Sequence, residues 1–251
     1  MRPGDPRNGV DLTAPLEIGT ATAPSRIFFG PHPTNLGRER SLTDGHRAYY
    51  ERRARGGAGV VVVEAASVHR SDWPYERAPL AERCGPGWAA ITEALAPSGT
   101  VVIAGLGHAG AQGTSAYSQS VLWGPSPVPQ NNDREVPKVM EPADVAALVE
   151  GFGSAAGAAV GAGMAGVEVN AGQFSLLRQF LSGLTNQRSD EWGTDRGRLL
   201  AEVLEEVRSR IGGGILGLRL SCDEMAPWAG ITPDHAAELA DRFAPDVDYL
   251  V

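Results

Sequence analysis

Six short apolar runs, separated by helical stretches, constrain the fold of this chain more than any other feature of its sequence. The runs occupy residues 27–29, 60–63, 101–104, 167–169, 215–220 and 247–251. Short continuous apolar runs are typical of strands that are buried on both faces of a parallel sheet. Strands that alternate with helices form such sheets through helical crossovers, so the sequence predicts an α/β fold.

Helices are expected between these strands, from the three-and-four spacing of apolar side chains and from residues that favour helix ends. The expected helices cover residues 46–55, 142–160, 200–211 and 233–243. Proline stands at the start of the second and the last, and Gly212 follows the third. A doubly wound sheet and a (β/α)8 barrel both fit this alternation, and both place their sites at the carboxyl ends of the strands.

One domain is expected over residues 26–251, preceded by an irregular lead-in over residues 1–25 that contains four prolines. No change of composition divides the domain. The chain stops at Val251, within the sixth apolar run, where a self-contained domain seldom ends.

The composition argues against several classes of function. The 22 Lys+Arg and 30 Asp+Glu residues give a net charge of −8, whereas a general nucleic-acid surface is basic. No apolar run approaches the ~20 residues of a membrane span, and the polar start does not have the form of a secretory signal, so a cytoplasmic location is expected. Two cysteines are too few for a disulfide framework or a cysteine-rich metal site, and no metal site is predicted.

A glycine motif after the third run matches a dinucleotide-binding fingerprint by spacing alone. Gly105, Gly107 and Gly110 fit the pattern G-x-G-x-x-G. That fingerprint works only where a helix begins at the glycines, so that its first amides meet a pyrophosphate. The segment that follows contains three prolines and no helical period, so a dinucleotide site is not predicted here.

Polar side chains at the apolar runs are the candidate site residues, because buried polar groups need partners and strand ends carry the sites of α/β folds. His32, Glu64 and His108 follow the first three runs, and each alone is more often structural than catalytic. Arg219 lies within the fifth run, where its guanidinium cannot lose its charge. It needs a buried anion, which Glu168 would supply, or a ligand that accepts its hydrogen bonds.

Two amide side chains, Asn170 and Gln173, follow the fourth run. Both can donate hydrogen bonds without carrying charge, which suits a carbonyl group or a developing oxyanion. The alternative is that they satisfy the backbone of their own loop. The polar loop over residues 186–193 is expected to brace the structure before the next helix.

Segments around the fourth strand resemble the signature of the old yellow enzymes, which are FMN-dependent (β/α)8 oxidoreductases and include the bacterial 2,4-dienoyl-CoA reductases. The segments are 165–170 (AGVEVN), 176–182 (LLRQFLS) and 186–193 (NQRSDEWG). Supporting matches lie at 30–36 (GPHPTNL), 64–68 (EAASV), 108–112 (HAGAQ) and 219–221 (RLS). The resemblance covers residues 25–251, and its details are most similar to the branch encoded alongside mycofactocin biosynthesis.

The resemblance implies an incomplete (β/α)8-type barrel with about six of the eight strands. The loops of strands seven and eight bind the FMN phosphate in this family, and those strands lie outside this sequence. The residues that the resemblance assigns to the flavin ring are Pro31, His32, Pro33, Ala65, Gly105 and Arg219. Arg219 would face the N1/O2 edge of the ring, and Gly105 stands where the family has a glutamine that bonds the pyrimidine.

The resemblance also implies an activity: hydride passes from NAD(P)H to FMN and then to a small carbonyl-conjugated or redox-carrier substrate. Asn170 and Gln173 stand at the family's pair of substrate-carbonyl ligands, and Ser175 replaces the tyrosine that usually gives the final proton. Substrate oxidation, with electrons passed to another acceptor, is the alternative direction. The cysteine clusters that hold an iron–sulfur cluster in longer relatives are not in this sequence, and association into homo-oligomers is left open.

Two further alternatives are kept. In the first, the chain is a non-catalytic barrel fragment that needs a partner, or the missing carboxyl-terminal part, to cover its unpaired strand edges. In the second, it is a flavin-free (β/α) barrel enzyme that uses Asp, Glu or His groups on a sugar or an aldehyde. A flavin absorption band in the purified chain would separate both from the leading hypothesis.

Overall fold

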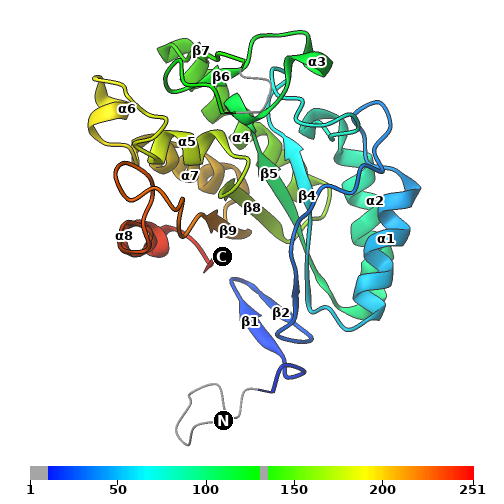
Figure 1. Ribbon diagram of the computed structural model, residues 1–251. Coiled ribbons are helices and arrows are strands. Elements are labelled where there is room, and N and C mark those ends of the chain that lie inside the picture. Colours follow the sequence, from blue (N-terminus) through cyan, green and yellow to red (C-terminus); the bar gives the residue numbers. More distant parts are fainter. Residues whose placement is uncertain (1–10, 131–134) are drawn as a thin grey trace, which may run out of the picture.

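The computed structural model describes residues 11–130 and 135–251, and its centre is a six-stranded sheet (Figure 1). From edge to edge the strands are β3 (Phe28–Phe29), β4 (Val60–Ser67), β5 (Val101–Gly107), β8 (Gly166–Ala171), β9 (Ile215–Leu220) and β10 (Tyr249–Leu250). All neighbouring strands of this sheet are parallel. Each strand overlaps one of the six apolar runs, so the predicted parallel α/β sheet is confirmed.

The strand order distinguishes a barrel from a doubly wound sheet. Across the sheet the strands follow one another as they do along the chain, without the reversal of order that a doubly wound sheet requires. One hydrophobic core joins the outward side chains of the strands to the helices that cover them. Those helices are α1 (Asp44–Arg55), α2 (Gly85–Leu95), α4 (Pro142–Gly161), α7 (Arg198–Ile211) and α8 (Pro233–Phe243).

The inner face of the sheet has a small core of its own at the amino ends of the strands. A hairpin of β1 (Leu16–Ile18) and β2 (Ala21–Ala23) lies across this end of the sheet (Figure 1). The core side chains are Ile18, Ala23, Val60, Val62, Val101, Ile103 and Ile215. Because alternate residues of a strand face opposite sides, β4 sends Val61 and Val63 to the helices and Val60 and Val62 to the hairpin.

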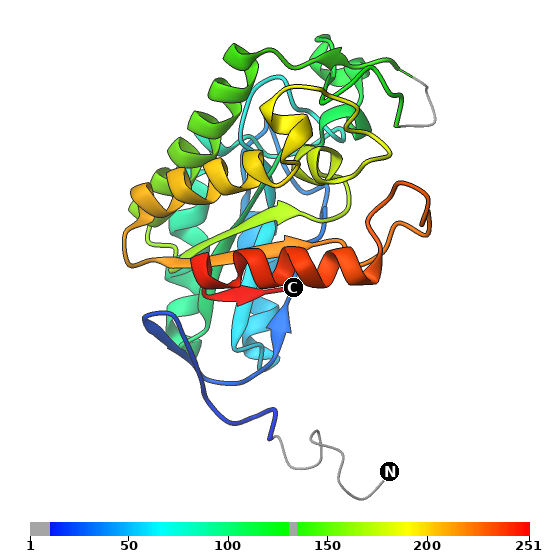
Figure 2. The ribbon, with the colours of Figure 1, turned by 90° about the vertical axis from the view of Figure 1, so that its left-hand side faces the viewer.

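The carboxyl ends of the strands carry the irregular part of the chain. The short elements here are α3 (Ser115–Ser118), β6 (Trp123–Gly124), β7 (Lys138–Val139), α5 (Leu176–Leu181) and α6 (Glu191–Thr194). Four 3-10 turns complete the described elements, at Ala81–Arg83, Ala96–Ser98, Gly110–Gln112 and Ala244–Asp246. In Figure 2, α8 lies in front of β9 and its partner β10, at the edge of the sheet opposite to β3.

Two local expectations differ from the structure. Residues 1–10 of the expected lead-in lie outside the described part of the chain, and residues 16–23 form the β1–β2 hairpin instead of irregular structure. Its three-residue strands are too short for the alternation of apolar and polar residues to predict them. Helix α2 was not expected because Gly85, Pro86 and Gly87 open it, although proline is well tolerated in the first turn of a helix.

Helix α4 is the one helix among the described residues that is long and apolar enough to cross a membrane by length and composition. In the structure it is a core helix. Leu148, Phe152 and Ala156 are fully buried in the main core, and α4 packs along α7 and against β5 and β8.

Candidate functional site

Ala65, Gly107 and Asn170 lie side by side near the carboxyl ends of β4, β5 and β8, and are called the floor of the site. A Cβ atom added at Gly107 would lie 3.5 Å from Asn170 Cβ and 3.7 Å from Ala65 Cβ. Gly107 therefore places no side chain between those of Ala65 and Asn170. Gly107 was not among the predicted site residues, although its two-residue spacing from Gly105 places both glycines on the same face of β5.

Arg219 lies beside this floor, because it pairs in register with Asn170 on the neighbouring strand. Its Nε donates to Glu168 Oε1 at 2.9 Å, so the ion pair considered from the sequence is present. The other end of the guanidinium reaches toward the loop that follows β3, where a Cβ atom at Gly30 would lie 3.5 Å from Nη2. Among the described residues, no hydrogen bond is made by either Nη atom.

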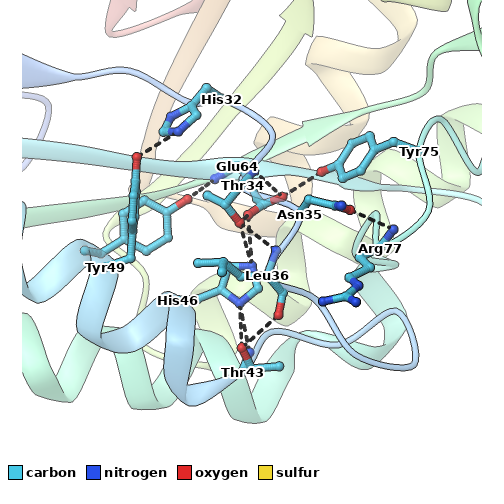
Figure 3. A network of polar contacts seen from close by, with 11 residues as sticks. His32, Thr34, Asn35, Leu36, Thr43, His46, Tyr49, Glu64, Tyr75 and Arg77 are labelled. Atoms are coloured by element: carbon cyan, nitrogen blue, oxygen red, sulfur yellow. Dashed lines mark hydrogen bonds and ion pairs between the residues drawn. The ribbon is translucent and has the colours of Figure 1, made fainter.

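The loop that carries Pro31, His32 and Pro33 is anchored by a buried carboxylate, Glu64 on β4 (Figure 3). Glu64 Oε1 accepts a hydrogen bond from the Thr34 hydroxyl, directly after Pro33. Glu64 is also the residue before Ala65. One side chain therefore holds together the two backbone segments to which the resemblance assigns the flavin ring.

Three ring side chains complete the surroundings of Glu64. The Tyr75 hydroxyl donates to Oε2 at 2.6 Å, and the backbone N–H of Glu64 donates to the Tyr50 hydroxyl at 2.8 Å. His46 Nε2 lies 2.9 Å from Oε1, and His46 Nδ1 accepts from the Thr43 backbone N–H at 3.0 Å. Because Nδ1 is an acceptor, the neutral ring carries its proton on Nε2 and donates it to the carboxylate.

These contacts determine the protonation state of Glu64. Burial by itself raises its pKa, but the hydrogen bonds from His46, Thr34 and Tyr75 outweigh burial and hold the pKa below its usual value. The group is a carboxylate with its acceptor positions occupied. These contacts agree with a structural role for Glu64.

His32 itself is exposed, and its Nε2 lies 2.7 Å from the Tyr49 hydroxyl (Figure 3). The Tyr49 ring is covered by Arg53, whose guanidinium carbon is 3.4 Å from the ring centroid. Helix α1 thus holds the His32 side chain through Tyr49. Pro31 is half-buried and Pro33 is exposed.

Gly105 is closed to any side chain. An added Cβ atom would lie 2.5 Å from the Val63 carbonyl oxygen and 3.0 Å from the Ala65 backbone. This position therefore offers only backbone at the site, close against the backbone of Ala65.

The amides of Asn170 and Gln173 differ in their surroundings. Asn170 Nδ2 donates to the Gln173 carbonyl at 3.2 Å, and Asn170 Oδ1 accepts from the Gly172 N–H at 3.0 Å. Asn170 therefore satisfies its own loop, which is the alternative considered from the sequence, and keeps one N–H of its amide. The Gln173 side chain is exposed, and the described residues give it no hydrogen bond.

Ser175 is a helix cap. Its hydroxyl donates to the Asn170 carbonyl and accepts from the backbone N–H of Leu177 at 3.1 Å. The residue is fully buried at the start of α5. Its hydroxyl thus both donates to and accepts from backbone groups, as is typical of a helix cap.

His108 is likewise structural. Its Nδ1 accepts from the Gly110 N–H at 3.0 Å, and its Nε2 lies 3.0 Å from the Ser71 hydroxyl. The ring stacks on Trp123 at 5.4 Å, and burial lowers the pKa of the imidazole. No helix of dinucleotide-binding type follows, since Gly110 opens a single 3-10 turn.

The loop over residues 186–193 is the brace expected from the sequence. Asn186 Nδ2 donates to the carbonyls of Phe180 and Trp192, at 2.7 and 2.8 Å. Arg188 donates to the Met140 carbonyl at 2.7 Å and pairs with Asp190. Within the described ranges, no three His, Cys, Asp or Glu side chains are grouped to hold a metal ion.

The sequence of residues 11–247 matches the model of the NADH:flavin oxidoreductase / NADH oxidase family. The chain belongs to this family. It is 30% identical over 231 residues to an NADPH dehydrogenase of Bacillus subtilis, a match that covers 89% of this chain and 67% of that protein. It is 34% identical over 205 residues to a metal reductase of Desulforamulus reducens, a match that covers 80% of this chain and 31% of that protein.

The fold agrees with a solved structure, the old yellow enzyme homologue of Zymomonas mobilis. The two share 26% sequence identity with a TM-score of 0.86, over 96% of this chain and 72% of that one. The predicted membership of the old yellow enzyme family and the predicted (β/α)8-type barrel, with six strands in this chain, are confirmed. The chain spans about a third of the length of the Desulforamulus relative and about two thirds of that of the Bacillus enzyme.

Proposed function

We propose that this chain binds the ring of FMN at the carboxyl ends of its strands and takes part in hydride transfer between NAD(P)H and a small-molecule substrate. The single observation that carries the proposal is the position of Arg219. Its Nε is bound to the buried Glu168, its Nη2 lies near Gly30 in the loop after β3, and neither Nη atom makes a hydrogen bond among the described residues. Membership of the NADH:flavin oxidoreductase family supports the same reaction class.

The residues present fit a flavin ring. The floor of Ala65, Gly107 and Asn170 has no side chain at its centre, which leaves room for a planar aromatic ligand. Arg219 would donate to the acceptor atoms on the pyrimidine edge and would balance the negative charge that the ring carries when reduced. The ring would contact the backbone of Pro31, His32 and Pro33. Gly105 would contribute only its backbone, which lies against Ala65.

When bound, FMN supplies hydride transfer from a reduced nicotinamide to an alkene conjugated to a carbonyl. The remaining N–H of the Asn170 amide and the exposed amide of Gln173 would donate to the substrate carbonyl. Both would stabilise negative charge on that oxygen without bringing a formal charge to the site.

Ser175 would not supply the proton that completes alkene reduction, because its hydroxyl is bound to the Asn170 carbonyl. The proton would then come from solvent, and alkene reduction would be slow compared with relatives that have a tyrosine. The same feature favours substrate oxidation or a redox carrier as the electron partner. The finer assignment to the mycofactocin-associated branch rests on the motifs and predicts such a carrier.

The test is the visible absorption spectrum of the purified, desalted chain, titrated with FMN and separately with riboflavin. We expect a shifted, saturable flavin band with both ligands, because the contacts proposed here are all to the ring. Arg219→Ala should weaken binding at least tenfold, whereas Arg198→Ala, an exposed arginine on the outer helix α7, should not.

If both flavins keep the absorption band they have in buffer, while the chain unfolds cooperatively in urea, the proposal is overturned and the flavin-free or the non-catalytic alternative is favoured. Equal binding by the Arg219→Ala variant would refute the role of Arg219. Arg219→Lys, which keeps the charge but loses the planar fork, should give intermediate affinity.

A further inference from the structure

Glu168 is the centre of a polar group enclosed inside the curled sheet. Its side chain is 2% exposed. Oε1 accepts from Arg219 Nε at 2.9 Å, and Oε2 accepts from the Tyr249 hydroxyl at 2.9 Å. Each carboxylate oxygen has one partner, and the two partners come from different strands.

Gly217 allows the Tyr249 hydroxyl to reach this carboxylate. Glu168 pairs in register with Gly217, and Gly217 pairs with Tyr249, so the three residues lie at one level of the sheet. The Tyr249 ring passes over β9 at the glycine and meets Glu168 on β8. Burial and the adjacent carboxylate both raise the pKa of Tyr249, so its hydroxyl keeps its proton and remains a donor.

The three side chains share one positive and one negative charge. Glu168 balances the charge of Arg219 from the inner side, at Nε. The Tyr249 hydroxyl donates a hydrogen bond to the other oxygen of the same carboxylate. This hydrogen bond reduces the effect of the negative charge of Glu168 on the guanidinium of Arg219. The outer end of Arg219, whose side chain is 29% exposed, presents whatever positive potential this arrangement leaves.

We propose that Glu168 and Tyr249 are positioning residues that fix Arg219 and set the positive potential it presents to the flavin ring, and thereby the preference of the site for reduced over oxidised flavin. The inference rests on the proposed function, because it needs the ring to lie against Arg219. It assigns no contact with the ring to either residue.

Opposite changes are expected from the two partners. Glu168→Gln keeps the shape and one hydrogen bond but removes the negative charge, so Arg219 is no longer balanced and the anionic reduced ring is favoured. Tyr249→Phe removes only the hydroxyl, so the full carboxylate charge acts on Arg219 and the reduced ring is less favoured. A purely structural role would weaken the binding of both redox forms equally.

The experiment is anaerobic calorimetric titration of the full chain and its variants with oxidised FMN and with dithionite-reduced FMN. The readout is the ratio of the two dissociation constants, oxidised over reduced. For Glu168→Gln we expect this ratio to rise about tenfold, which corresponds to a rise of about 30 mV in the two-electron potential of the bound flavin. For Tyr249→Phe we expect it to fall about threefold.

Glu150→Gln is the matched control, because it removes the same charge from an exposed site on the outer helix α4. Its ratio should equal that of the unchanged chain. An unchanged ratio in both Glu168→Gln and Tyr249→Phe, or an equal rise in the control, would overturn the inference while leaving FMN binding intact. If Glu168→Gln does not fold, Tyr249→Phe decides alone. Failure of the unchanged chain to bind either form would overturn the proposed function and this inference with it.

Discussion

The ring of Tyr249 lies directly over Gly217: a Cβ atom at residue 217 would be 2.2 Å from Tyr249 Cζ. No heavy atoms of a folded protein approach so closely without a bond. The position of the Tyr249 ring on β10 therefore requires a glycine at residue 217 on β9.

Gly217→Ala should therefore destabilise the protein by about 1–3 kcal/mol, because the ring or the strand must move to admit the methyl group. Urea denaturation monitored by circular dichroism measures this. Gly213→Ala is the control, since the nearest atom to its Cβ would be 4.0 Å away, and it should stay within about 0.5 kcal/mol of the unchanged protein. Equal stability of the two variants would contradict the observed packing.

The hydrogen bond from Tyr75 to Glu64 can be tested by removing only the Tyr75 hydroxyl group. Tyr75→Phe removes one donor to a buried carboxylate and should cost about 1.5–3 kcal/mol of unfolding free energy. Tyr117→Phe, at an exposed residue, should have almost no effect. Because Glu64 anchors the loop after β3, hydrogen exchange at residues 34–36 should also become faster in Tyr75→Phe and not in Tyr117→Phe.

Two histidines should make the protein sensitive to mild acid. Burial lowers the pKa of His108 and of His69 below the ordinary 6.5. The unfolded chain then takes up these protons first, so the free energy of unfolding should fall as the pH drops from about 7 through 6.5. Below about pH 6.5, where the unfolded chain holds this proton and the folded chain does not, each histidine contributes a slope of up to about 1.4 kcal/mol per pH unit.

Glu64 should add a second, more acidic step. Its pKa is held below the usual 4.5, so its stabilisation is complete above that pH and is lost as the pH falls toward the lower folded value. Urea denaturation at a series of pH values measures both steps. His108→Asn should flatten the slope between about pH 7 and 5.5 and leave the acidic step; an unchanged slope would show that His108 does not titrate in this way.

Glycines in α4 should respond in opposite directions to the same substitution. Gly157→Ala adds a methyl group 3.8 Å from Arg210 Cβ, an ordinary contact, and should stabilise the helix by about 0.5–1 kcal/mol. Gly151→Ala would place its methyl group 2.8 Å from the Val68 carbonyl oxygen and should destabilise the protein. Thermal unfolding of the two variants compares them, and a stabilised Gly151→Ala would refute the close approach of α4 to Val68, the residue after β4.

Much of the fold was accessible from the sequence, because the apolar runs and the helix signals are local. The run over residues 215–220 and β9 have the same bounds, and Gly212 ends α7 as expected. Barrel and doubly wound sheet differ only in which strands become neighbours, and periodicity carries no information on that. The resemblance to the old yellow enzymes predicted the barrel, and the order of the strands agrees with that prediction.

The candidate site was accessible only in part. Arg219 was found because a charge inside an apolar run is conspicuous, and its partner Glu168 was named. Tyr249 was missed, because a tyrosine in a short terminal strand is an ordinary core residue until Gly217 is seen beneath it. Whether Asn170 faces a ligand or its own loop depends on a turn of four residues, which no spacing in the sequence reveals.

The order of the strands also has a consequence in time. Each strand of the sheet pairs with the strand that leaves the ribosome just before it, so the sheet can grow as the chain is made. The β1–β2 hairpin is the exception. Its turn residue Thr20 donates to the carbonyl of Gly213, which is synthesised 193 residues later. The end of the sheet that is made first therefore completes its contacts only after most of the chain has been synthesised.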